Sequence, residues 1–532
     1  MPDKFINQID KAIFVLIKAT IFLLPLFFLP WSGEYFEFNK QFLLWLFAPT
    51  AALLWLFKAA AEKKLIVKAN PLNLPVLIFL SLTAVAAFFS LDRFSSFFGH
   101  FGRFSDAWLG LFSLVIFYFL IINTRVADSA EKIIGLIKLL LYSSFIAAAV
   151  SLAAMFGWLS ALSGDPLSIF SSASFNPAGG SLLSLAGFLA TMSIISAGFL
   201  FRPAPNSAEE FSSKKFDRIF FSACLVLFLV ILALVDFSLS WALVILGAGL
   251  IIFFRLLDPG FNFKKILNRH LLIPGALIIL AGFMLALPNF NLAKIFLGRE
   301  LPKEARLEYG QSWTIVKEVF KKSPALGSGP GTFAEDFSLF RPAELNQSAF
   351  WQIRFDKSRS HFLETLATAG LLSLLSWFLI ICLVFYLNIV LLKKYLASRG
   401  ALGADEDYNL ITVLFIIFIL IFCSQLLFLT NTVLNFIFWF CLALIIVFWQ
   451  RNNQILFKEK TIDLNKTVIF YRASVLILFI LSAGVFTLLV FEVKFFAADL
   501  IAARDSDRET GLITAIKLNP YLYNYRLGLA KL

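Results

Sequence analysis

The residues best suited to chemistry stand at the end of the one long polar stretch in the chain, residues 289–361. His361 and Glu364 are three positions apart, so a helix puts both side chains on one face. A histidine beside a carboxylate can remove a proton near neutral pH while the carboxylate orients its ring. We therefore hypothesise that His361 is a general base oriented by Glu364. The alternative is a histidine that caps a helix at a membrane interface.

The same stretch is rich in basic side chains. They are Lys294, Arg299, Lys303, Arg306, Lys317, Lys321, Lys322, Arg341, Arg354, Lys357 and Arg359. They could bind an anionic ligand, or they could form a solvated face balanced by the acidic residues of the stretch. Charge alone leaves both readings open.

A glycine-rich turn lies between these two features. Residues 304–322 have the apolar spacing of an amphipathic helix, which Pro324 ends. Gly327, Gly329 and Gly331 follow at alternate positions. They allow unusual backbone dihedrals and leave N–H groups that can bind an anion. No Gly-Lys-Ser/Thr follows, so the pattern is not a phosphate-binding P-loop.

The elements that position these residues are membrane spans. Apolar residues make up 60% of the 532, charged residues 15%, and the mean hydropathy is +0.84, whereas soluble domains are about 25% charged. The sequence therefore predicts an all-α, polytopic integral membrane protein with 12–13 transmembrane helices. Spans are expected near 12–30, 40–57, 72–91, 105–122, 133–158, 180–201, 219–236, 238–257, 271–288, 362–392, 410–429, 432–449 and 469–492.

Lysine and arginine in the short loops predict the orientation. Alternate loops carry clusters such as Lys58, Lys63, Lys64 and Lys68, then Arg202, Lys214, Lys215 and Arg218, then Arg255, Lys264, Lys265 and Arg269, and finally Arg451, Lys458, Lys460 and Lys466. The loops between them carry little more than Arg93 and Arg103. By the positive-inside rule the N-terminus is cytoplasmic, whereas the loop 289–361 and the tail 493–532 are extracytoplasmic. Much of the net charge of +12 thus serves topology, which gives no reason to expect nucleic acid.

Several of these segments together resemble the O-antigen ligase/polymerase family. The likeness is carried by Arg306 to Trp313, by Ser323–Phe333 with its three glycines, and by Ser360-His361 followed by Leu363-Glu364 and Gly370-Leu371-Leu372. Phe98–Arg103 is similar to the Gly-x-x-Gly-Arg segment of that family, and Ser174–Pro177 to its Asn-Pro element. With the span count, the resemblance covers most of residues 1–492, which we take as one transmembrane domain.

The resemblance implies a glycosyltransferase of the cytoplasmic membrane that acts at its outer face. Such enzymes move a glycan from a polyprenyl diphosphate carrier to an acceptor hydroxyl on a lipid or protein, or polymerise repeat units, without metal, nucleotide or other cofactor. Arginine suits a departing diphosphate because it binds the oxygens through two parallel hydrogen bonds. On this basis His361 is the expected base, and Arg306, Arg359 and Arg103 are expected to bind the donor.

The chain departs from the family pattern at two positions. Trp241 stands where the family has an arginine near the start of the eighth span, and Phe362 replaces the asparagine of a His-Asn pair. Losing a cation that binds the diphosphate could cost several kcal/mol of charge stabilisation. Either another cation substitutes or the chain has left the usual reaction.

The tail, residues 493–532, resembles the end of one tetratricopeptide repeat and the start of the next, through Ala515–Pro520 and Tyr521, Tyr525, Leu529 and Ala530. Such repeats bind proteins, but one repeat cannot bury its own apolar face. The tail is thus either the start of a truncated repeat region or a terminal amphipathic helix.

Two other function classes stay open. A transporter of lipid-linked glycans would need ionisable residues inside its spans, and few are visible, among them Lys18, Lys138, Asp236 and Glu492. A non-catalytic scaffold would recruit partners through the tail, and Trp241 is its best support. The four cysteines lie in apolar runs and have no metal-site spacing, so we expect no metal.

Overall fold

A computed structural model describes residues 3–162, 164, 167–200, 208–257, 269–287, 291–302, 304–397, 404–452, 458–464, 468–506 and 508–532. Helices dominate this part of the chain, and its only strands are β1 (Lys64–Ala69) and β2 (Lys458–Asp463). Some basic residues used above lie outside the described residues, namely Arg202, Lys264, Lys265, Lys303 and Lys466.

Nine helices in the described ranges are long and apolar enough to cross a membrane. They are α2 (Glu37–Glu62), α6 (Ala130–Met155), α7 (Leu182–Phe199), α8 (Ala208–Val235), α9 (Ser238–Leu256), α15 (Gly370–Ala397), α16 (Ala404–Leu427), α17 (Thr432–Asn452) and α18 (Val468–Arg504). Three shorter apolar helices are α3 (Asn73–Phe88), α5 (Trp108–Asn123) and α10 (Arg269–Ala286). The remaining predicted span, 12–30, only partly overlaps α1 (Asp3–Leu23), which begins and ends earlier in the chain. The prediction of an all-α polytopic membrane protein is confirmed.

Two further predicted boundaries differ from the structure, whereas the pair α8 and α9 agrees with the prediction. The single span expected at 362–392 is wrong, because the chain breaks between α14 (His361–Thr368) and α15. The closely spaced pair α8 and α9 is separated by a turn at Asp236, which has a φ of 47°. Helix α18 continues past residue 492 to Arg504, because Phe495, Ala498 and Ala502 pack into an aromatic core.

The described residues form two compact units. Unit 1 comprises Met1–Asp128, Arg306–Ile380 and Gln450–Leu532, and unit 2 comprises Ser129–Ala305 and Ile381–Trp449. The predicted outer loop 289–361 is therefore divided at residue 306. His361, Glu364 and the glycine-rich turn all belong to unit 1, whereas Trp241 belongs to unit 2.

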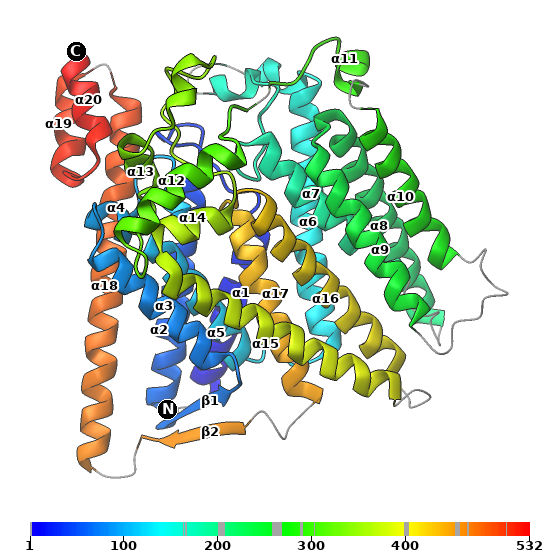
Figure 1. The fold of residues 1–532 in the computed structure, drawn as a ribbon. Helices are drawn as coiled ribbons and strands as arrows, with labels where there is room; N and C mark the ends of the chain where they lie inside the picture. Colours follow the sequence, from blue (N-terminus) through cyan, green and yellow to red (C-terminus); the bar gives the residue numbers. More distant parts are fainter. Residues whose placement is uncertain are drawn as a thin grey trace. The chain divides into compact units, whose positions relative to one another are not determined.

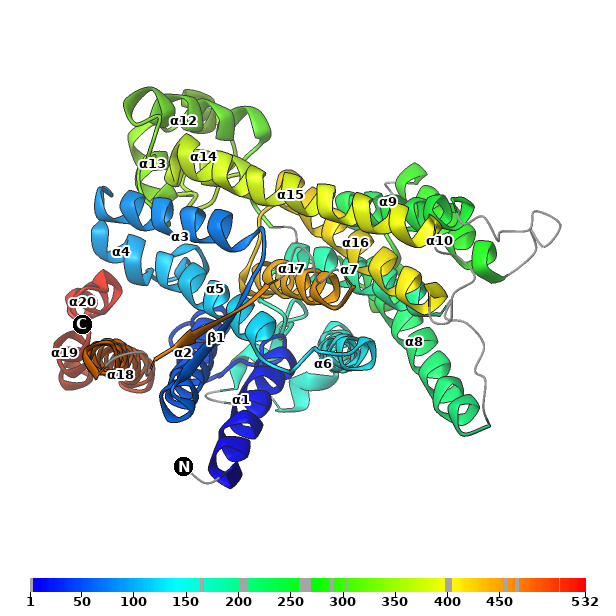
Figure 2. The same ribbon diagram turned by 90° about the horizontal axis from the view of Figure 1, so that it is seen from below.

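Unit 1 gathers its alternate loops at two ends (Figure 1), and Figure 2 views the molecule nearly along α18. At one end β1 and β2 pair antiparallel, with Lys64 opposite Asp463. At the other end lie α4 (Arg93–Phe98), α12 (Tyr309–Lys322), α13 (Phe333–Leu339) and α14 (Figure 1). At that end the Leu91 N–H donates to the Ser328 carbonyl at 3.0 Å, and the Gly33 N–H donates to the Asp499 carboxylate at 2.8 Å.

The tail packs onto the rest of unit 1. Helices α19 (Glu509–Leu518) and α20 (Tyr523–Lys531) follow α18. Leu512, Ala515 and Tyr525 join a buried cluster with Phe38 and Phe104. The Tyr521 ring also stacks on that of Phe94 in α4, with centroids 4.1 Å apart. Unit 1 thereby covers part of the apolar surface that a lone repeat could not bury itself.

Unit 2 is built around α7, whose side chains are almost all buried. Small residues let the helices approach closely, as expected where van der Waals packing drives helix association in lipid. A Cβ added at Gly247 of α9 would lie 2.6 Å from Ile194 of α7. One ion pair joins α6 to α8, from Lys138 to Asp217 at 2.5 Å. Helix α11 (Leu292–Leu297) lies in the part of the predicted outer loop that belongs to unit 2.

Candidate functional site

The break between α14 and α15 is filled by the glycine-rich turn. The last carbonyls of α14 accept hydrogen bonds from this turn, Ala367 from the Ser328 N–H at 3.0 Å and Thr368 from the Gly329 N–H at 2.8 Å. The first N–H groups of α15 donate back to it, Leu371 to the Pro324 carbonyl at 3.0 Å. Helix ends leave four such groups unsatisfied each. The turn therefore stabilises the break and holds α14 as a separate short helix.

Close approach explains two of the glycines. A Cβ at Gly327, which has a φ of +70°, would lie 2.3 Å from the Ala367 carbonyl oxygen. A Cβ at Gly370, with a φ of +75°, would lie 2.4 Å from the Ala325 carbonyl oxygen. Neither position tolerates a side chain without moving backbone. The sequence pattern therefore marks a tight contact between the turn and the helix break.

The predicted anion-binding role of Gly327, Gly329 and Gly331 stays a prediction. The N–H of Gly327 donates to the Ser323 carbonyl at 3.0 Å, and that of Gly329 to Thr368. In this arrangement both groups already have partners inside the protein. Gly331 has a φ of +76° at the end of the turn, just before α13.

Three charged residues form the centre of the site. Arg103 is 1% exposed and forms an ion pair with Glu364 on α14. Its Nη2 atom also lies 3.0 Å from Asp106 Oδ2. The second oxygen of Glu364 accepts the Ser358 N–H at 3.0 Å. Buried charges are costly unless paired, and this group pairs one guanidinium with two carboxylates.

His361 begins α14 beside this group. Ser360 caps the helix, with its side chain accepting from the Leu363 N–H at 3.4 Å. Burial lowers the pKa of His361 below its usual value; the nearby Asp106 carboxylate raises this pKa, and the Arg103 cation lowers it. A lowered pKa keeps the imidazole neutral near pH 7, which is the form that accepts a proton.

Glu364 has partners other than those expected from the spacing. Its contacts to Arg103 and Ser358 hold both carboxylate oxygens. The proposed contact of Glu364 with the His361 ring stays a prediction. Sequence reasoning missed Asp106, although its position three residues after Arg103 is a spacing that brings charged side chains together in helical turns.

The other two cations expected to bind the donor are Arg359 and Arg306. Arg359 is partly buried, and its guanidinium carbon lies 4.9 Å from the centre of the Tyr309 ring. The Arg359 N–H donates to Ser312 Oγ at 3.0 Å, which ties this segment to α12. Arg306 is exposed, shortly before Glu308 and Gln311 form the capping box of α12. Arginine on an aromatic face keeps its donors available to an anion.

A second buried network lies beneath the glycine-rich turn. Ser328 Oγ donates to Asp336 Oδ2 at 2.6 Å, and Thr332 Oγ1 donates to the Gly329 carbonyl at 2.6 Å. Burial raises the pKa of Asp336 to about 7, which the Ser328 hydrogen bond counteracts in part. The turn therefore rests on a carboxyl group that titrates near neutral pH.

Two further residues from the sequence patterns belong to unit 2. Trp241 is 0% exposed, near the start of α9. Asn176 is also fully buried, and its Nδ2 donates to the Ser174 carbonyl at 3.2 Å. Its loop is held by Asn431, whose Nδ2 donates to the Ala178 carbonyl at 3.0 Å. Both residues therefore pack inside unit 2.

Comparison of the sequence with family models and with characterised proteins found no match. The function therefore has to be argued from the residues and their geometry.

Proposed function

We propose that the protein is a membrane glycosyltransferase that moves a glycan from a polyprenyl diphosphate carrier to an acceptor hydroxyl. The observation that carries this proposal is His361 beside the buried group of Arg103, Asp106 and Glu364. The resemblance of the sequence segments to O-antigen ligases and polymerases supports the same reading. We infer further that the protein lies in the cytoplasmic membrane with this site on the extracytoplasmic side.

His361 would act as the base. The acceptor hydroxyl gives its proton to the neutral imidazole while its oxygen bonds to the anomeric carbon of the donor sugar. The bond from that carbon to the diphosphate oxygen breaks, and the carrier diphosphate leaves with the electron pair. The lowered pKa of His361 favours the neutral ring that this step requires.

Arg359 and Arg306 would stabilise the leaving diphosphate. Arg359 is partly buried against Tyr309, which restricts its side chain and reduces its contact with water. Charge stabilisation is stronger in such a partly dehydrated place. Arg103 is less suited to bind the donor directly, because its charge is already paired with two carboxylates. We therefore assign Arg103 and Glu364 to the positioning of α14.

Ligation and polymerisation share this chemistry, and the acceptor decides between them. An acceptor lipid or protein makes the protein a ligase, and a second lipid-linked repeat unit makes it a polymerase. The tail, packed on α4 through Tyr521, is the segment that we expect to contact a protein partner.

A transporter of lipid-linked glycans is the second candidate, favoured by one observation. Lys138 and Asp217 pair at 2.5 Å between α6 and α8, which are both candidate spans. Ionisable residues within spans commonly serve translocation paths. Purified protein in liposomes distinguishes the two: a transporter moves the labelled donor across the bilayer, and a transferase joins its glycan to an acceptor.

The test of the transferase compares His361→Ala and Arg359→Ala with Lys317→Ala. Lys317 is an exposed basic residue of the same loop, so the last variant controls for a general loss of charge. Glycan transfer is measured by mass spectrometry of envelope glycolipids and glycoproteins, and insertion by the yield of folded protein. We expect His361→Ala to abolish transfer, Arg359→Ala to reduce it, and Lys317→Ala to leave it unchanged. Normal transfer by folded His361→Ala refutes the assigned base.

A further inference from the structure

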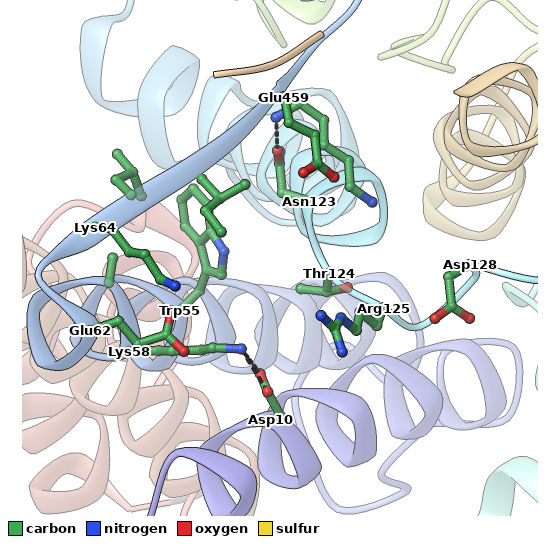
Figure 3. A pocket seen from close by; sticks show the side chains of 14 residues that line it. Asp10, Trp55, Lys58, Glu62, Lys64, Asn123, Thr124, Arg125, Asp128 and Glu459 are labelled. Carbon is green, nitrogen blue, oxygen red and sulfur yellow. Dashed lines mark hydrogen bonds and ion pairs between the residues drawn. The ribbon is translucent and has the colours of Figure 1, made fainter. Parts of the chain in front are cut away.

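The charged side chains at the two ends of unit 1 are arranged differently. At the β1–β2 end, four basic and four acidic side chains line a cavity of about 360 Å³. These groups compensate one another, and Lys58 Nζ lies 2.6 Å from each carboxylate oxygen of Asp10 (Figure 3). At the other end, α18 meets the turn that joins α1 to α2, and there carboxyl groups gather without equal compensation. The proposed transfer reaction uses none of them.

Two carboxyl groups hold this turn against α18. The Gly33 N–H donates to Asp499 Oδ2 of α18 at 2.8 Å. Glu34, the next residue, caps α2: its Oε1 accepts the Glu37 N–H at 2.8 Å, and its Oε2 accepts the Phe38 N–H. Asp499 therefore ties the end of α18 to the start of α2. We call the contact of Gly33 and Glu34 with Asp499 the tail contact.

The charges at the tail contact do not balance. Glu34 interacts electrostatically with the carboxylates of Glu37 and Asp499. Lys40 is the cation that faces Glu34 and Glu37, and its Nζ donates to a backbone carbonyl at 2.7 Å. Glu37, Lys40 and Asp499 are all buried. Because buried like charges disfavour ionisation, three carboxyl groups beside one ammonium are most stable when one of them keeps its proton.

Glu34 is the group outside the spans that holds this proton. Its pKa is raised to about 7, mainly by burial and then by the Glu37 carboxylate, with a smaller contribution from Asp499. The N–H groups that it caps lower this pKa in part. The docked arrangement is therefore favoured at acidic pH, and the advantage is lost as the pH rises from about 4.5 to about 7.

The tail is the part of unit 1 that can respond. Few side chains of α18 are buried along its span, so its outer end depends on local contacts. These are the tail contact and the packing of Leu512, Ala515 and Tyr525 on Phe38 and Phe104. Both Figures 1 and 2 show α19 and α20 beside the end of α18. An element held by so few contacts opens before the rest of the fold.

We propose that the tail contact is a pH-sensitive switch, in which ionisation of Glu34 releases α19 and α20 from the start of α2 and its protonation docks them. The ionised Glu34 repels Asp499, and separation of the two lets water reach both carboxylates. The turn and α2 stay in place, because their own hydrogen bonds do not involve the tail.

Hydrogen–deuterium exchange of the full-length protein in nanodiscs tests this switch. Exchange of the α19 backbone N–H groups is measured by mass spectrometry at pH 6 and pH 8, and each rate is divided by that of an unstructured peptide at the same pH. The change in the pKa of Glu34 from 4.5 to about 7 predicts about tenfold faster exchange at pH 8. Exchange of α7, in unit 2, should change much less.

Three variants separate the switch from other effects of pH. Glu34→Gln keeps an oxygen for the α2 cap but cannot ionise, so the ratio between the two pH values should fall to about one. Glu509→Gln is the matched control, because Glu509 is an exposed carboxylate at the start of α19, and it should keep the tenfold ratio. Gly33→Ala puts a Cβ 2.6 Å from Asp499 Oδ1, so α19 should exchange rapidly at both pH values.

Three results would overturn the proposal. They are equal exchange of α19 at pH 6 and pH 8, an equally large change in α7, and a tenfold ratio that persists in folded Glu34→Gln. Should Glu34→Gln fail to fold, Gly33→Ala decides the matter, because Gly33 lies exposed in the turn. Slow exchange with an unchanged pH dependence in that variant contradicts the role of the tail contact.

Discussion

Replacing Arg103 by methionine is expected to destabilise the protein strongly, and the loss should depend on Glu364. The arginine is 1% exposed and Glu364 is 5% exposed, so neither charge can regain water when its partner is removed. Arg103→Met leaves two carboxylates without their cation, the buried one of Glu364 and the partly buried one of Asp106. Glu364→Gln keeps the shape of the side chain and leaves Arg103 paired with Asp106 alone.

The distances give the expected size of the effect. At the 3.0 Å between Arg103 and Asp106, and with an effective dielectric constant of about 20, one pair has a gross attraction of roughly 5–6 kcal/mol. Desolvation offsets part of this attraction, and removing one partner of a buried pair costs about 3–5 kcal/mol. We expect about 4 kcal/mol for Arg103→Met and roughly half of that for Glu364→Gln, which keeps one pair intact.

A double-mutant cycle measures the coupling between the two residues. The free energy of unfolding is measured for the four proteins in mixed micelles by reversible titration with SDS. The double variant leaves only Asp106 unpaired, so it should be about 2 kcal/mol more stable than the sum of the single effects predicts. Additive effects to within about 0.5 kcal/mol would refute the reasoning, because independent residues behave in that way.

Three more predictions concern other residues. Burial raises the pKa of Asp336 to about 7, so the folded protein keeps a proton that the unfolded chain releases, and stability falls as the pH rises from about 4 to about 7. Asp336→Asn should remove about 2–3 kcal/mol of that fall between about pH 5 and about pH 8 in the same SDS titration, and an unchanged pH dependence contradicts it. Gly327→Ala should cost about 2–4 kcal/mol of unfolding free energy, because its Cβ would meet the Ala367 carbonyl oxygen. Gly310→Ala is its control, since no atom lies within 4 Å of that Cβ, and equal stabilities would contradict the steric argument. Trp241→Arg should lower the yield of folded protein on size-exclusion chromatography, because a fully buried cation in a span costs about 2–3 kcal/mol, and a folded variant with tighter donor binding is the contrary result.

The helices could be predicted from the sequence because lipid imposes a simple rule. Each span must satisfy its own backbone hydrogen bonds over about 20 apolar residues. Each predicted span overlaps a helix, although the run at 362–392 is divided between α14 and α15. The pair α8 and α9 is found as predicted, with only the turn at Asp236 between the two helices. Composition also excluded a soluble fold. Both inferences depend only on composition and on the hydropathy of each segment, which can be read directly from the sequence.

Contacts between distant segments could not be predicted in the same way. Arg103 lies in the loop between α4 and α5 and Glu364 lies on α14, and no local pattern pairs them. The spacing of His361 and Glu364 correctly put both residues on α14, but it could not reveal that Arg103 binds this carboxylate. The helix break was missed because the stretch from α14 into α15 is mostly apolar. The carbonyls that accept hydrogen bonds from the first N–H groups of α15 belong to the distant residues Pro324 and Ala325.

Asp106, Arg103 and Glu364 together make the position of α14 depend on the segment that follows α4. Helix α4, which precedes that segment, is held from two sides. Ser328 of the glycine-rich turn accepts the Leu91 N–H at 3.0 Å, and Tyr521 of the tail stacks on Phe94. A partner that pulled the tail away would expose the Phe94 ring and release one of these two supports. We therefore expect displacement of the tail to alter the geometry around His361 without direct contact, through residues that all belong to unit 1.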